Sequence, residues 1–187
     1  LDIISFLLES WSDAIKAKNR FHETPLTVAC EGGASLDVIY LLLKRWPGAI
    51  KEKNSLNETP LHTSCQGEAS LDVISLLVGN RHDTIKRKGN FDCTPLHAAC
   101  WCASSVDVIS FFLKCCPAAI KKKNRFGETP LHTACRLGYR SSLETISLLL
   151  KIWPGALDEK NINDETPFHI AYSDEGPIEI FLLLLDA

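Results

Sequence analysis

One short string recurs along this chain at nearly constant intervals. Thr-Pro-Leu-His occurs at Thr59–His62, Thr94–His97 and Thr129–His132, and the close variants Thr24–Thr27 and Thr166–His169 extend the series. The intervals between the threonines are 35, 35, 35 and 37 residues. A fixed period of this size is typical of repeat proteins, in which each unit is one small structural element that packs against its neighbours.

Other columns of the sequence keep the same period. A small residue and a cysteine follow each of the first four strings, and an aliphatic-acidic group comes farther on. These columns are Ala29-Cys30, Ser64-Cys65, Ala99-Cys100 and Ala134-Cys135, then Leu36–Ile39, Leu71–Ile74, Val106–Ile109 and Leu143–Ile146. Agreement in so many columns at one period establishes internal repetition.

Each unit predicts two helices. The threonine of the string is a good N-cap, and the proline after it suits the first helical position, where its missing N–H costs nothing. This first helix is short, roughly two turns, and we expect it to end near glycines such as Gly32 or Gly138. A second helix is predicted to begin at a serine (Ser35, Ser70 or Ser142) because apolar residues follow at helical spacing.

Proline ends the second helix, and an extended link is predicted to follow. The helix ends are expected around Trp46-Pro47, Cys116-Pro117 and Trp153-Pro154. The link is predicted to run through Ala49–Asn54 and its equivalents and to turn at Asn57 or Gly127. A helix pair of this size cannot bury its own apolar face, so stacking of several units is a condition of folding.

The strings and columns resemble the repeats of the ankyrin family, whose signature is Thr-Pro-Leu-His-x-Ala, over essentially the whole chain. The resemblance implies an all-α repeat solenoid of stacked helix-turn-helix units with short extended hairpin turns. These units have 35 residues, against about 33 in the family. We expect a single ankyrin-repeat array over 1–187, with a partial repeat at 1–18, repeats at 19–53, 54–88, 89–123 and 124–160, and a partial repeat at 161–187.

Composition excludes several classes of function. The net charge of −3 gives no global bias towards nucleic acid, and no apolar run approaches the roughly 18–20 residues of a membrane span. No nucleophile elbow, phosphate-binding glycine loop or paired-carboxylate motif is present, so we predict no enzymatic activity and no cofactor. The chain contains no Met and opens in what reads as a helix, so we expect it to belong to a longer protein with further repeats or domains.

Histidine and cysteine also recur once per unit. Neighbouring units lie roughly 10 Å apart, too far for His62, His97, His132 and His169 to share a metal, and the family resemblance implies that these histidines bond backbone between units. Cys30, Cys65, Cys100 and Cys135 cannot form disulfides at that spacing. Reduced thiols predict an intracellular, cytoplasmic protein.

Four further cysteines lie in the third unit. Two interpretations of these residues are open: a metal or redox role, or accessible thiols without a special role. The sequence contains no paired cysteine spacing of the kind that binds zinc, so nothing in it favours the metal role. The four residues are Cys93, Cys102, Cys115 and Cys116.

The resemblance implies that hairpin tips and the exposed side of the first helices bind protein partners. Phe21, Leu56, Phe91 and Phe126 form a column at the tips, and the alternative is that these side chains pack on adjacent turns. Trp101 stands in a first-helix column that is otherwise polar, so it is the strongest single contact residue. The predicted partner-binding residues are Arg20, Phe21, Leu56, Phe91, Trp101, Arg125, Phe126 and Arg136.

A lysine column allows two interpretations. Lys18, Lys53, Lys88, Lys123 and Lys160 could form a basic stripe for an acidic partner. The alternative is a self-compensating face, because Glu23, Glu58, Glu128 and Glu165 run along the same turns.

The sequence therefore predicts a non-catalytic scaffold that binds a protein partner of unknown identity. The alternative function is a structural spacer within a longer solenoid or multidomain protein. A third hypothesis is that the chain has a thiol redox or metal-binding role, which no motif in the sequence favours.

Overall fold

The computed structural model of this protein describes residues 12–79, 83–136, 142–173 and 177–186, and every regular element within those ranges is helical. The chain forms two compact units, residues 1–90 and residues 91–187. The predicted helix end near Gly138 and most of the predicted partial repeat at 1–18 lie outside the described residues.

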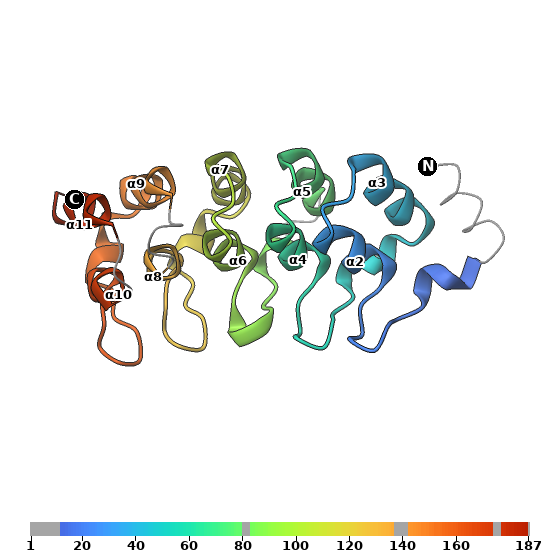
Figure 1. The fold of residues 1–187 in the computed structure, drawn as a ribbon, viewed down its shortest axis with the longest axis horizontal. Coiled ribbons are helices and arrows are strands. Elements are labelled where there is room, and N and C mark those ends of the chain that lie inside the picture. The colour runs from blue at the N-terminus through green and yellow to red at the C-terminus, as the bar shows by residue number, and fades with distance from the viewer. Residues whose placement is uncertain (1–11, 80–82, 137–141, 174–176, 187) are drawn as a thin grey trace. The chain divides into compact units, whose positions relative to one another are not determined.

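In the first unit, two pairs of α-helices stack. Helix α2 packs against α4 and α3, and α5 packs against α3 and α4. Figure 1 shows α2 and α4 in one row, α3 and α5 in a second row, and the hairpin loops on the free side of the first row. The elements are η1 (Ser12–Lys16), α2 (Pro25–Glu31), α3 (Leu36–Arg45), η2 (Pro47–Lys51), α4 (Pro60–Gln66), α5 (Leu71–Val78) and η3 (Thr84–Lys86).

The second unit repeats this arrangement. Helices α6, α8 and α10 form one row, α7, α9 and α11 form the other, and each helix packs on its partner and on the next in its row. A single turn, η4 (Asn90–Asp92), precedes it. The elements are α6 (Pro95–Trp101), α7 (Val106–Cys115), η5 (Pro117–Lys121), α8 (Pro130–Cys135), α9 (Leu143–Ile152), η7 (Pro154–Asp158), α10 (Pro167–Ser173) and α11 (Ile178–Leu185).

The repeated string forms the N-terminus of each first helix, as predicted. Thr59, Thr94 and Thr129 are N-caps in extended conformation, and proline follows at the first helical position. The histidine three residues on completes a reciprocal cap, because its Nδ1 accepts the N–H of the capping threonine, at 3.2 Å for Thr94 and His97. The string thus satisfies backbone donors that every helix start leaves open.

The serines predicted to start the second helices are at the N-cap position, but they differ in bonding. Ser70 Oγ accepts from Val73 N–H and Ser142 Oγ accepts from Thr145 N–H. Ser35 makes no capping hydrogen bond through its side chain. The second helices end where predicted, with C-caps at Trp46, Cys116 and Trp153, because the next residue is proline.

The predicted extended link is wrong in its first half. Pro47–Lys51 forms a 3₁₀ helix, in which Ala49 N–H donates to Trp46 O at 3.1 Å and Glu52 N–H donates to Ala49 O at 3.1 Å. Proline presets the φ value that this turn needs, and the turn buries Ala49 (1% exposed) and Ile50 (6%) against the stack. The chain becomes extended only from Glu52.

The glycine of each Trp-Pro-Gly string has a packing reason. A Cβ on Gly48 would lie 2.8 Å from Trp46 Nε1, and one on Gly155 would lie 3.1 Å from Trp153 Nε1. The indole ring therefore lies against the glycine backbone. Where the third repeat has Cys116 in place of tryptophan, residue 118 is alanine.

The apolar columns supply the core of each unit. In the first unit Leu61, Ile74 and Leu77 are fully buried, and in the second Phe112 and Leu131 are at most 1% exposed. Each such side chain contributes roughly 1.5–3 kcal/mol relative to an exposed position. The core therefore lies between helices, and the hairpin loops remain available to solvent.

Candidate functional site

An asparagine at the start of every hairpin but the third fixes the tip. Asn54 Oδ1 accepts the backbone N–H groups of Leu56 (3.0 Å) and Glu58 (2.9 Å). Asn124 Oδ1 does the same for Phe126 and Glu128. Positive φ values follow at Asn57 (64°) and Gly127 (73°), as the predicted turn positions require. These bonds turn residues 55–56 and 125–126 outwards.

The predicted tip column is exposed throughout. Phe21 is 48% exposed, Leu56 52%, Phe91 46% and Phe126 40%. In the first unit the Arg20 guanidinium lies 4.7 Å above the Phe21 ring. The largest tip side chains therefore remain accessible to another molecule.

The packing interpretation of the tip aromatics is confirmed for Phe91 and Phe126 in the second unit. The Phe91 and Phe126 rings are 5.3 Å apart at their centroids, so they do pack on the adjacent turn. Arg125 lies 5.6 Å from the first ring and 6.0 Å from the second. Contact between the rings leaves nearly half of each accessible, so packing does not remove them from a docking surface.

The third hairpin departs from the asparagine pattern. Gly89 and Cys93 take the places held elsewhere by asparagine and glutamate. A Cβ on Gly89 would lie 2.9 Å from the His62 ring. Phe91 and Asp92 then both take positive φ, at 52° and 60°, which is uncommon for a phenylalanine.

In the first-helix column that contains Trp101, Gln66 and Arg136 reach back to the glutamate of their own hairpin. Gln66 Nε2 donates to Glu58 Oε1 at 3.1 Å, and Arg136 forms an ion pair with Glu128. The pKa of the Glu31 carboxyl is raised by desolvation and then by the charge of Glu23 and a hydrogen bond with it. Gln66 and Arg136 therefore brace their hairpins, whereas Glu31 and Glu23 carry like charges.

Trp101 is the exception in that column. The corresponding hairpin residue in its repeat is Cys93, which carries no carboxylate. Trp101 is the last residue of α6 and is 51% exposed. A half-exposed tryptophan without the bracing role of its counterparts matches the residue types that dominate binding interfaces.

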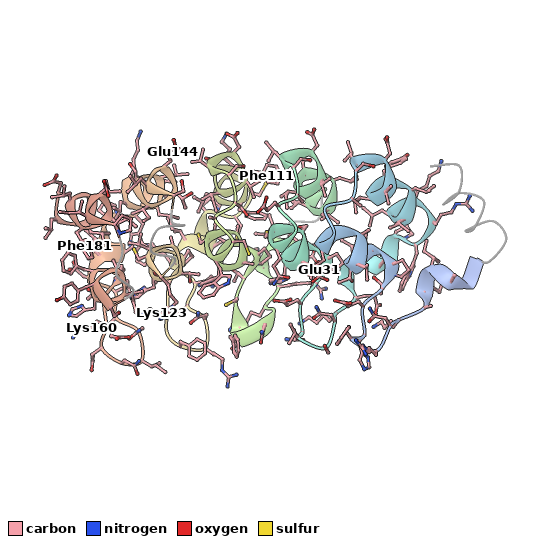
Figure 2. All side chains as sticks on the ribbon, viewed as in Figure 1. Glu31, Phe111, Lys123, Glu144, Lys160 and Phe181 are labelled. Carbon is pink, nitrogen blue, oxygen red and sulfur yellow. The ribbon has the colours of Figure 1, made fainter. Side chains whose placement is uncertain are left out.

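Lys18, Lys123 and Lys160 of the lysine column pair with acids other than those predicted. Lys18 Nζ lies 2.8 Å from Glu52, and Lys123 Nζ lies 2.8 Å from Glu159. Lys123 Nζ also donates to Lys160 O at 2.9 Å, which links successive hairpins of the second unit, where Figure 2 labels both lysines. The hairpin glutamates are instead used by asparagine and by the first-helix residues. The self-compensating interpretation therefore fits the described lysine pairs better than a free basic stripe.

His97 and His132 have the structural role that the resemblance implies. His97 Nε2 donates to Glu128 O and His132 Nε2 donates to Glu165 O, both at 3.1 Å, in the next hairpin along. Burial lowers the pKa of His97 to about 4, against the opposing effect of its bond to Glu128. The neutral ring is the form that this position holds.

The cysteines divide by burial. Cys30, Cys65, Cys100 and Cys135 are buried, and burial raises the pKa of Cys30 and Cys135 to about 12. Cys93, Cys102 and Cys115 are partly exposed. The expectation of accessible thiols is wrong for Cys116, which the turn after α7 buries to 6% exposure.

Within the described ranges, no group of three or more His, Cys, Asp or Glu side chains is arranged to hold a metal ion. Nor does that part of the chain contain a helix long and apolar enough to cross a membrane.

Two features were missed in the sequence. One is the contact of Arg125 with rings of two successive hairpins, which requires knowing the distance between tips. The other is an aromatic cluster at the last helix pair, where Phe181 lies 5.8 Å from Phe168 and 6.3 Å from Tyr172, between α10 and α11 (Figure 2). The spacing of Phe168 and Tyr172 along one helix was the available signal.

Comparison with known proteins identifies the fold family. A family model described as ankyrin repeats (3 copies) matches residues 1–88 and 96–187. No curated protein matches this chain in sequence. A similar solved chain comes from a structure described as the predatory endopeptidase Bd0816 from Bdellovibrio bacteriovorus in complex with immunity protein Bd3460, with 24% identity, a TM-score of 0.81 and coverage of 100% of this chain and 92% of that chain. That likeness shows the fold alone. Because the family match extends over nearly all of its residues, the chain belongs to the ankyrin-repeat family.

Proposed function

We propose that this chain is a non-catalytic protein-interaction module that grips a protein partner with its hairpin tips and first helices. The observation that carries the proposal is the exposure of large side chains there, above all Trp101 at 51%. The proposed contact residues are Arg20, Phe21, Leu56, Phe91, Trp101, Arg125, Phe126 and Arg136. Aromatic and arginine side chains are the types that contribute most to interface energy.

The family supports this proposal at a coarser level, because ankyrin repeats are in general protein-interaction modules without catalytic activity. The similar solved structure is described as a complex of two proteins. Its description concerns those proteins, and it carries no information about the partner of this chain.

Site-directed photo-crosslinking tests the proposed surface. A photoreactive phenylalanine analogue replaces Trp101 in one variant and Tyr40 in another, in the cell that makes the protein. Tyr40 is a matched control because it is 54% exposed but lies on a second helix, α3. We expect a discrete crosslinked partner from position 101 and none from position 40. Equal crosslinking at both positions, with folding intact by circular dichroism, would overturn the assignment.

We also propose that the chain works in a reducing, intracellular compartment. All eight cysteines are free in the structure, which supports this assignment. Mass spectrometry of protein alkylated during lysis, without a reductant, measures it directly. Eight alkylated cysteines agree with the proposal, whereas a native disulfide would contradict it.

The second candidate function is a spacer within a longer array, and one residue favours it. Leu185 is 68% exposed, whereas Leu113 and Leu150, in the same helix column, are 5% and 4% exposed because the next helix covers them. A further repeat would cover Leu185 in the same way. One position argues against this candidate. Cysteine occupies it at 30, 65, 100 and 135, but the last helix pair has the larger Tyr172 there. A departure from the pattern of the other repeats is typical of a terminal repeat. Sequencing the complete transcript decides it, since a spacer requires more repeats beside this segment.

A further inference from the structure

Two successive hairpins of the second unit build an exposed aromatic surface around one arginine. The Phe91 and Phe126 rings are 5.3 Å apart, and Arg125 lies within 6.0 Å of both centroids. Phe91 is 46% exposed, Phe126 is 40% exposed and Arg125 is exposed as well. These three residues are called the Phe91–Arg125–Phe126 platform.

Backbone bonds hold the platform in place. Arg125 N–H donates to Phe91 O at 2.9 Å, which joins one hairpin to the next. Phe126 N–H donates to Asn124 Oδ1 at 2.9 Å, which fixes the turn that carries it. The side chains therefore project from a rigid base.

Within the described residues, Arg125 differs from the neighbouring cations Lys123 and Arg136 in forming no ion pair. Lys123 pairs with Glu159, and Arg136 pairs with Glu128, so those charges are satisfied. Within the described part of the chain, Arg125 has ring contacts but neither an ion pair nor a side-chain hydrogen bond. A cation–π contact with a ring uses none of the guanidinium N–H groups as a hydrogen-bond or ion-pair donor to an oxygen, so they remain for a planar acceptor such as a carboxylate.

We propose that the platform binds an acidic segment of the partner protein, an inference that rests on the proposed protein-binding function. An aspartate or glutamate of that segment pairs with Arg125, and an adjacent apolar side chain lies on Phe91 and Phe126. Charge complementarity selects the carboxylate, and the aromatic area favours the apolar neighbour. A nucleic acid fits less well, because the chain is acidic overall, at −3, and the lysine of the same hairpin, Lys123, is already paired.

A random-peptide phage library panned on the full chain tests this inference without knowledge of the partner. Enriched peptides are then synthesised with a fluorescent label, and their affinities are measured by anisotropy. We expect enriched sequences to carry aspartate or glutamate beside leucine or an aromatic residue. Arg125→Ala is expected to weaken binding of these peptides about tenfold or more. Arg125→Lys is expected to retain only part of the parent affinity, because lysine keeps the charge but lacks the paired N–H donors of a guanidinium.

Lys114→Ala is the matched control. Lys114 is an exposed cation of the same unit, in the last turn of α7, so its removal changes the net charge equally. We expect this variant to bind the peptides within about twofold of the parent, since it lies on a second helix.

The outcomes separate this inference from the broader proposal. Enriched peptides without acidic residues that lose affinity with Trp101→Ala would overturn the acidic-segment inference and leave the protein-binding function standing. Peptides whose binding depends on no tip or first-helix residue would overturn both. Arg125-dependent binding of oligouridylate that is tighter than binding of every enriched peptide would also overturn the inference, in favour of a nucleic-acid surface.

Discussion

The histidine column shows how a single residue links the stability of this protein to pH. His97 is fully buried and neutral, with its Nδ1 at the cap of its own helix and its Nε2 on the carbonyl of the next hairpin. Protonation would put a charge into that site and remove an acceptor that the cap needs. Burial lowers the pKa of His97 from 6.5 to about 4. Between these pH values His97 is mostly neutral in the folded state and mostly protonated in the unfolded state.

The sign of the resulting pH dependence follows from linkage. The unfolded state binds the proton more readily, so the contribution of His97 is complete above pH 6.5 and is lost as the pH falls towards 4. We expect the free energy of unfolding to fall by up to roughly 3 kcal/mol from this residue. Urea denaturation at several pH values measures the fall, and His97→Gln is expected to show a shallower one. An equal slope in both proteins would refute the assignment.

Thiol reactivity is expected to follow burial. Cys93, Cys102 and Cys115 are partly exposed, whereas the other five are buried. A maleimide added to the folded protein is therefore expected to modify those three first and the rest only after unfolding, because the reagent cannot reach buried thiols. Peptide mapping over time gives the order, and early labelling of Cys30 or Cys135 would contradict it.

At the scale of the helix, two glycines in equivalent positions predict different responses to the same substitution. Gly32 and Gly67 each end a first helix with φ near −80° (−79° and −81°), so an added Cβ causes no strain in the backbone angles. A Cβ on Gly67 would strike the carbonyl oxygens of Cys30 and Glu31 in the neighbouring helix. A Cβ on Gly32 would meet only Val28 O, at 3.3 Å.

We expect Gly67→Ala to lower the free energy of unfolding by roughly 1–3 kcal/mol, because backbone must shift to make room. Gly32→Ala is the matched control and is expected to change the free energy of unfolding by less than about 1 kcal/mol. Alanine lowers the entropy of the unfolded chain, which stabilises the fold, and the tight contact with Val28 O acts in the opposite direction. Thermal or urea denaturation of both variants provides the comparison. A larger loss for Gly32→Ala would mean that the helix ends do not approach as described.

Helices and capping were predictable from the sequence because each depends on neighbours along the chain. The Thr-Pro start, the proline stop and the apolar columns all act within one or two turns. The link after each second helix was predicted wrongly, because the 3₁₀ turn at Pro47–Lys51 is favoured by the burial of Ala49 and Ile50 against the stack. Likewise, the residues of the platform were predicted individually, but their contact depends on the distance between hairpins.

At the scale of the whole molecule, the exposure of one position in the second helices depends on whether another helix packs over it. Leu150 in α9 is 4% exposed, and Leu185 occupies the same column of α11 at 68%. We expect Leu150→Ala to cost roughly 2–5 kcal/mol of unfolding free energy, whereas Leu185→Ala is expected to cost less than about 0.5 kcal/mol. Denaturation of the two variants tests this, and similar losses would indicate that another surface covers α11.

The backbone bond between Arg125 and Phe91 has a kinetic consequence. Because the two hairpins are joined before any partner arrives, little loop entropy remains to be lost on docking. We therefore expect association with the proposed partner to be limited by diffusion and charge steering, without a slow rearrangement. Differences in affinity among variants of this surface are expected to lie mainly in how long a complex survives.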